Sequence, residues 1–188
     1  MKQTLVSLAV LVTLLAAFFA LNAYIYDEKQ GDQGLVEDYK DGLYFLSGEP
    51  IQLTDGVSKV PAAPESPIMN VTRYFGNEVR GDLDGDGDED VAFLVTYEPA
   101  NSGPYFFLAG AINEGGKYRG THLMLIGDHV APQTTEYRDL GAPYGARVIV
   151  NYARTDVTPS EGKSLYAKYS AETNDFGEVV QDFEGESR

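Results

Sequence analysis

Short apolar stretches, separated by residues that favour turns, recur along this chain from Met69 to its end. Clusters of glycine, proline, asparagine and aspartate bound each stretch, as they bound the strands of β-rich domains. No segment after residue 30 shows a sustained period of 3.6 residues, which an amphipathic helix would require. The pattern therefore predicts antiparallel β structure. The expected strands are Asn77–Gly81, Val91–Tyr97, Tyr105–Asn113, Gly120–Ile126, Thr134–Tyr137, Arg147–Tyr152, Ser164–Ser170 and Glu178–Phe183.

Two of these stretches differ from the others in being almost continuously apolar. They are Val91–Val95 and Phe106–Ile112, and such runs are typical of central strands that are buried on both faces. The chain has 188 residues, which is enough for one domain with its own core and short for two. We expect an all-β fold, with a single antiparallel β domain built as a sandwich or as a strongly curled sheet.

The N-terminal segment has a different character. Residues 5–26 carry no charge, and Lys2 precedes them. The apolar core of 17 residues, Leu5–Leu21, is near the lower limit for a transmembrane helix and longer than the usual apolar region of a signal peptide. Two interpretations stay open: a signal anchor that remains as a transmembrane helix, or a signal peptide cleaved after Ala23.

Both interpretations place the rest of the chain outside the cytoplasm. Lys2 predicts that the N-terminus stays inside the cell. If the anchor is retained, the protein is a single-pass protein of the cell membrane that contacts the bilayer through residues 5–26. If the segment is cleaved, the protein is secreted.

These features divide the chain into three expected regions. Residues 1–26 form the signal anchor or signal peptide, residues 27–68 form a linker with a possible short hairpin, and residues 69–188 form the β domain. The hairpin is suggested by two short apolar stretches, Leu43–Leu46 and Ile51–Leu53. Three prolines within Val60–Pro67 indicate an extended linker or an edge loop.

Charge and cysteine content exclude several classes of function. The formal net charge of −15 repels nucleic acid, so no nucleic-acid partner is expected. The absence of cysteine excludes disulfides, zinc-thiolate sites and cysteine nucleophiles. A bound metal ion is another way to stabilise an exported domain.

The most informative motif is an acidic loop between two expected strands. Aspartates occupy alternate positions, and the intervening Gly85 and Gly87 permit the positive φ angles of a tight turn. Calcium prefers six to eight oxygen ligands, which alternate carboxylates of such a loop supply. The loop 82–90 therefore predicts a Ca²⁺ site. Its expected ligands are the side chains of Asp82, Asp84, Asp86 and Asp90 and the backbone carbonyl of Asp88.

The loop is not a complete EF-hand, since Phe93 stands where an EF-hand has its bidentate glutamate. It resembles the calcium loops of FG-GAP/VCBS-type repeats, which join two β-strands. A wider resemblance covers Gly81–Val95, Ser102–Ala109 and Leu125–Val130. These segments are similar to a family of uncharacterised bacterial exported proteins and lipoproteins, in which an arginine replaces His129. The resemblance implies location and fold and carries no activity.

No catalytic constellation is recognisable, so the chain is not expected to be an enzyme. His122 and His129 are interpreted as structural or surface residues. We expect a binding or structural module whose protein or glycan partner the sequence does not identify. The alternatives are an envelope-associated inhibitor or assembly partner, and a hydrolase acting on envelope polymers. The aromatic residues interpreted as core, with a ligand groove as the alternative, are Tyr105, Phe106, Phe107 and Tyr118.

Overall fold

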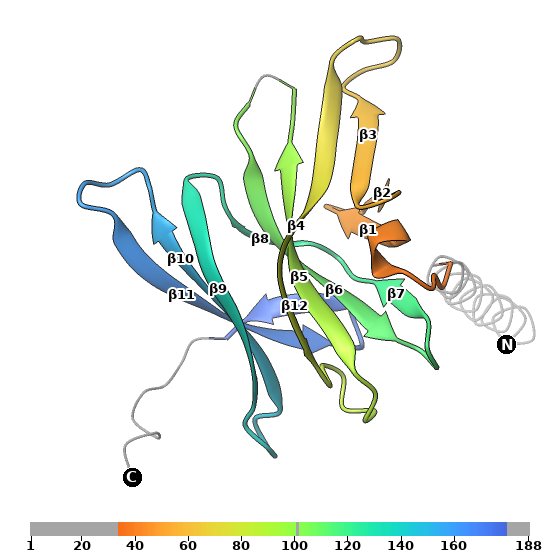
Figure 1. Cartoon of the computed structure of the whole chain (residues 1–188), viewed down its shortest axis with the longest axis vertical. Coiled ribbons are helices and arrows are strands. Elements are labelled where there is room, and N and C mark those ends of the chain that lie inside the picture. Colours follow the sequence, from red (N-terminus) through yellow and green to blue (C-terminus); the bar gives the residue numbers. More distant parts are fainter. Residues whose placement is uncertain (1–33, 101, 180–188) are drawn as a thin grey trace, which may run out of the picture. The chain divides into compact units, whose positions relative to one another are not determined.

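The computed structural model describes residues 34–100 and 102–179, and these residues form β-strands and one short 3-10 helix (Figure 1). The expected membrane segment, residues 1–26, lies outside the described residues. No helix among the described residues is long and apolar enough to cross a membrane. The elements are η1 (Tyr39–Asp41), β1 (Leu43–Leu46), β2 (Glu49–Gln52), β3 (Val57–Pro61), β4 (Met69–Gly81), β5 (Asp90–Glu98), β6 (Tyr105–Asn113), β7 (Tyr118–Gly120), β8 (Met124–Gly127), β9 (Val130–Asp139), β10 (Ala146–Arg154), β11 (Glu161–Ser170) and β12 (Asp175–Glu178).

The strands pair antiparallel in three sheets. A six-stranded sheet has the order β3-β4-β5-β6-β7, with β8 as its sixth strand. Both β7 and β8 pair with β6: β7 pairs with residues 111–113 and β8 with residues 106–108. A four-stranded sheet has the order β12-β11-β10-β9, and β1 and β2 form a hairpin. The expectation of an antiparallel all-β domain is confirmed.

One face of the six-stranded sheet packs against the four-stranded sheet. Ala92, Leu94 and Leu108 point to this side, where Val148 and Val150 of β10 meet them. We call this layer the inter-sheet core. Its alternating positions follow from the period-2 geometry of a strand, which sends every second side chain to the same face.

The opposite face of the same sheet is also buried. Phe93, Val95 and Ala109 lie there, under Tyr44 and Leu53 from the N-terminal part of the described chain. We call this layer the N-terminal core. Residues 90–96 of β5 are therefore buried without interruption, which confirms the prediction that the almost continuously apolar stretch is a central strand.

Residues 35–61 belong to this packing, so the boundary expected at residue 69 falls inside the sheet. The expected hairpin forms as β1 and β2, and β3 pairs with β4 across the proline-containing segment. Short apolar stretches at Tyr44, Ile51 and Leu53 supply the side chains that cover the sheet. A proline is tolerated at the end of β3 because this strand lies at the edge of its sheet.

The strand expected at Gly120–Ile126 is interrupted. It forms β7 and β8, with a break at residues 121–123. In the break, the Thr121 hydroxyl accepts a hydrogen bond from the Gly110 N–H at 2.9 Å, and the Leu123 N–H donates to the Phe45 carbonyl at 2.8 Å. In this break the chain forms hydrogen bonds to β6 and to the N-terminal segment in place of regular strand pairing. The apolar periodicity of the sequence does not reveal such a break.

Glu78 on β4 connects η1 to the sheet through hydrogen bonds. The Tyr39 hydroxyl donates to Glu78 Oε2 at 2.6 Å, and the Tyr74 hydroxyl donates to the same oxygen at 2.8 Å. These two hydrogen bonds, and then the positive charges of Arg80 and Lys40, lower the pKa of Glu78. Burial, followed by the bond to Glu78, raises the pKa of Tyr39 to about 12, so its hydroxyl remains a donor at neutral pH.

We predict that Leu53→Ala destabilises the whole domain by about 2–5 kcal/mol, because it opens a cavity in the N-terminal core. Leu53 is 1% exposed. Urea denaturation followed by near-ultraviolet circular dichroism of the tyrosines measures the change. Leu140→Ala is the control, since this leucine is exposed and its loss should change the free energy by less than about 0.5 kcal/mol. Equal effects of both substitutions would contradict the packing of residues 35–61 on the sheet.

A second prediction concerns pH. The folded pKa of Glu78 lies below its ordinary value of 4.5, so its hydrogen bonds contribute stability above pH 4.5 that is lost as the pH falls through the folded pKa. Glu78→Gln should therefore lower the free energy of unfolding by about 1 kcal/mol at pH 7 and by less at pH 3. Urea midpoints at the two pH values test this, and a penalty that grows on acidification would contradict it.

Candidate functional site

The acidic loop connects β4 to β5, two adjacent strands of the six-stranded sheet. Gly81 and Asp90 pair at its base and close it. Leu83 turns inward and packs in the inter-sheet core, with 7% of its surface exposed. The Tyr137 hydroxyl, from β9 of the other sheet, donates to the Asp82 carbonyl at 3.0 Å. Both sheets therefore hold this loop.

Three of the five predicted ligand residues converge. Asp82, Asp84 and Asp86 each offer a carboxylate oxygen, and these oxygens lie within 4.8 Å of one another. The Asp88 side chain is exposed and is not part of this group, and the prediction that its backbone carbonyl is a ligand stays a prediction. Asp90 is fully buried at the base of the loop.

The curled shape of the loop comes from aspartate side chains that accept hydrogen bonds from backbone N–H groups. Asp82 accepts from Gly85 at 2.7 Å and from Gly87 at 3.1 Å. Asp84 and Asp86 each accept from the N–H two residues later, at 3.1 and 2.8 Å. Gly85 and Gly87 have φ angles of +89° and +96°, which residues with a side chain rarely adopt. These local bonds hold the Asp82, Asp84 and Asp86 carboxylates close to one another.

Asp90 has a separate role, since it joins the loop to β6. Its two carboxylate oxygens accept from the Leu83 N–H and from the Asn113 N–H, each at 2.7 Å. The Asn113 side-chain amide donates a hydrogen bond to the Glu89 carbonyl at 3.2 Å. Burial raises the pKa of Asp90, while the two N–H bonds act in the opposite direction.

The loop concentrates negative charge, and among the described residues its one ion pair joins Glu89 to Arg80 at 3.5 Å. Burial is the largest cause that raises the pKa of Asp84, and the neighbouring Asp86 and Asp82 add to it. Within the described part of the chain, no lysine or arginine forms an ion pair with Asp82, Asp84 or Asp86. Chemically, the loop offers hard oxygen ligands and unbalanced charge, which suit a divalent cation.

Sequence reasoning missed the residues that support the loop from other elements. Asn113 lies 23 positions after Asp90, and Tyr137 lies 55 positions after Asp82. The pairing of β5 with β6 and the contact of β9 with β4 bring them together. The only sequence signal was an asparagine at the end of the β6 stretch, and no local pattern marks Tyr137.

The histidines lie apart from the loop in hydrogen-bond and ring contacts of their own. His122 stacks on Phe45, with ring centroids 5.0 Å apart and planes at 30°. His129 is exposed and lies 3.0 Å from the Asp128 carboxylate.

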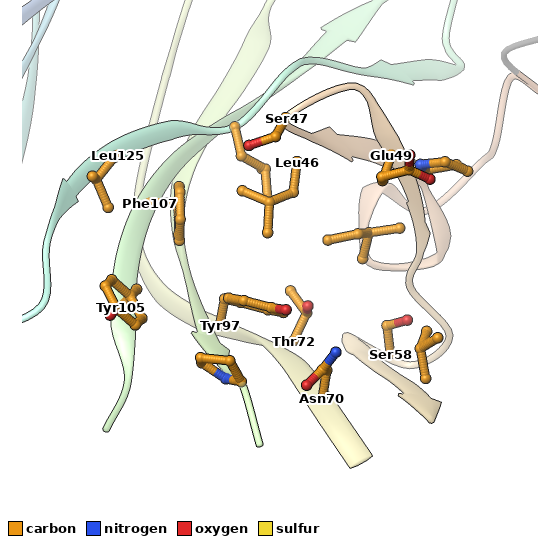
Figure 2. Close-up of a pocket in the computed structure, with 15 residues that line it drawn as sticks. Leu46, Ser47, Glu49, Ser58, Asn70, Thr72, Tyr97, Tyr105, Phe107 and Leu125 are labelled. Carbon is orange, nitrogen blue, oxygen red and sulfur yellow. The ribbon is translucent and has the colours of Figure 1, made fainter. Parts of the chain in front are cut away.

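A groove opens on the face of the six-stranded sheet that also carries the N-terminal core (Figure 2). Its volume is 780 Å³, and the β1–β2 hairpin forms one wall. Of the four aromatic residues singled out in the sequence, Tyr105 and Phe107 line it. The other two do not: Phe106 packs edge-on against Phe75, and Tyr118 packs against Tyr39.

Comparison with known proteins identified no relative. No family model, no curated protein and no solved structure matches this chain.

We predict that Asp90→Ala destabilises the protein by about 1–3 kcal/mol even in EDTA, because it leaves the buried Leu83 N–H and the half-buried Asn113 N–H without an acceptor. Asp88→Ala removes the same charge from an exposed position of the loop and should change the free energy by less than about 0.5 kcal/mol. Chemical denaturation of both variants in EDTA gives the comparison. Equal stability of the two variants would show that the Asp90 bonds do not hold the loop.

Proposed function

We propose that this protein is a calcium-binding β domain that acts outside the cytoplasm as a binding or structural module. The observation that carries the proposal is the convergence of the Asp82, Asp84 and Asp86 carboxylates in one tight loop. These oxygens and the Asp88 carbonyl would coordinate the calcium ion. Asp90, at the base of the loop, would add negative charge, and the lone pairs of its carboxylate that accept no N–H bond could also coordinate the ion.

The loop is well placed for an ion to act on the fold. Its two flanking strands lie inside the six-stranded sheet, Asp90 reaches β6, and the Asp82 carbonyl is held by Tyr137 of the other sheet. An ion bound to these carboxylates would remove their mutual repulsion and fix the end of β4 relative to the start of β5. Because the ion would bind the folded state and not the unfolded chain, it would stabilise the folded state by mass action.

A location outside the cytoplasm would suit a calcium site of moderate affinity. Calcium modules of the extracellular space bind with dissociation constants of about 0.1–1 mM. Such a site fills after export and remains free of calcium in the cytoplasm. We further propose that residues 5–26 tether the domain to the membrane if they are not cleaved.

We expect 2 mM calcium to raise the free energy of unfolding by about 0.6–1.8 kcal/mol over the value in EDTA. For a domain of this size, that corresponds to a rise of roughly 1–7 °C in the melting temperature. Differential scanning calorimetry of the full-length protein measures it. The double variant Asp82→Asn/Asp86→Asn should lose the rise.

The matched control is Asp128→Asn/Asp156→Asn, which removes the same charge from exposed positions outside the loop. This control should keep the full calcium response. Terbium gives an independent readout, since Tyr137 contacts the loop and can sensitise terbium luminescence at the site. A calcium response that is absent in the natural protein, or equal in the two double variants, would refute the proposed site.

A further inference from the structure

The groove shown in Figure 2 lies at the opposite end of β4 and β5 from the acidic loop. Thr72 pairs with Tyr97 beside the groove, whereas Gly81 pairs with Asp90 at the loop. The groove floor spans β3, β4, β5, β6 and β8, and the β1–β2 hairpin stands over one end of it. Any ligand of the groove would therefore bind away from the carboxylates of the loop.

Four hydroxyl-bearing residues form one row across the groove. Strand register pairs Ser58 with Thr72, Thr72 with Tyr97, and Tyr97 with Tyr105. All four residues line the groove. Adjacent strands lie about 4.8 Å apart, so the row extends over about 14 Å. We call these residues the hydroxyl row.

The fold does not use these hydroxyls. Within the described part of the chain, the side chains of Ser58, Thr72, Tyr97 and Tyr105 form no hydrogen bond. Ser58 is 8% exposed and Thr72 is 4% exposed, so both residues are more than nine-tenths buried. Among the described residues, the fully buried side-chain atoms without a hydrogen-bond partner are Arg73 Nη1 and Thr135 Oγ1, so the Ser58 and Thr72 hydroxyls still reach the solvent of the groove that both residues line.

The neighbouring Asn70 adds an oriented donor. Its side-chain oxygen accepts a hydrogen bond from the Ala100 N–H at 2.9 Å. This bond fixes the amide, and its NH₂ group forms no hydrogen bond with the described residues. Asn70 lines the groove beside the row (Figure 2).

Charge restricts what the groove can accept. Glu49 is the only charged residue among the described residues that line it, and the protein as a whole carries a net charge of −15. No lysine, arginine or histidine of the described ranges lines the groove. Phosphate, sulfate or carboxylate groups would be repelled and would find no cation. The fitting ligand is therefore uncharged.

An acyl chain or an added peptide strand fits less well. An acyl chain would cover Ser58, Thr72 and Asn70 without offering them a partner, at a cost of about 1–3 kcal/mol for each buried group. An added strand would need the free edge of β3, where Lys59 and Pro61 oppose pairing. A ligand with hydroxyl groups of its own can form hydrogen bonds with the hydroxyl row.

We propose that this groove binds an uncharged oligosaccharide that lies across the strands along the hydroxyl row. Sugar hydroxyls exchange hydrogen bonds with Ser58, Thr72 and Asn70, while the C–H faces of the rings pack on Tyr97 and Phe107. The spacing of the strands is close to the length of one sugar unit in a β-linked chain, so successive units meet successive strands.

Isothermal titration calorimetry of the full-length protein tests this, in a detergent without a sugar head group. The probes are cellotetraose, chitotetraose, mannotetraose and maltotetraose, each up to about 10 mM, which detects weak binding. We expect saturable binding of at least one probe. Ser58→Ala/Thr72→Val should weaken it about tenfold, since it removes two hydroxyls and little volume. Tyr97→Phe, which removes one hydroxyl, should weaken it less.

The control is Thr135→Val on β9, which removes a buried threonine hydroxyl that also lacks a partner but lies in the other sheet. It should bind the probe as the natural protein does, and circular dichroism verifies that every variant is folded. No saturable binding of any probe would overturn the proposal. Binding that is equal in all variants, or binding of laurate in place of the sugars, would overturn it as well.

Discussion

The burial of β5 on both faces is the constraint on which the rest of this structure depends. Residues 90–96 are buried without interruption, so each face of the sheet needs its own cover. The four-stranded sheet covers one face, and the N-terminal segment with Tyr44 and Leu53 covers the other. The acidic loop and the groove are located at the two ends of this strand and its neighbour β4.

The two sites differ in how the fold uses their polar groups. In the loop, the aspartates accept hydrogen bonds from the backbone, and Asp90 links the loop base to β6. The loop is therefore shaped by its own side chains, and charge repulsion is what an ion would relieve. In the groove, the hydroxyls of Ser58 and Thr72 have no partner among the described residues and remain available to a ligand.

The sequence predicted those features of the structure that follow from a local pattern of residues. The apolar run around Phe93 identified the central strand, and the spacing of the aspartates identified the loop whose carboxylates converge. It did not predict what depends on register. The contact of Tyr137 with Asp82, the bond of Asn113 to Asp90 and the alignment of Ser58 with Thr72 join residues that only strand pairing brings together. Short stretches such as Ile51–Leu53 have too little periodicity to show that they cover a sheet.

The stoichiometry of calcium binding is the most direct test of whether the acidic loop holds one calcium ion. Equilibrium dialysis of the full-length protein against radioactive calcium, in a buffer of physiological ionic strength, counts the bound ions. We expect one ion per chain, with a dissociation constant of about 0.1–1 mM. A titration without saturation would mean that calcium only screens a surface of net charge −15, and it would refute a specific site in the loop.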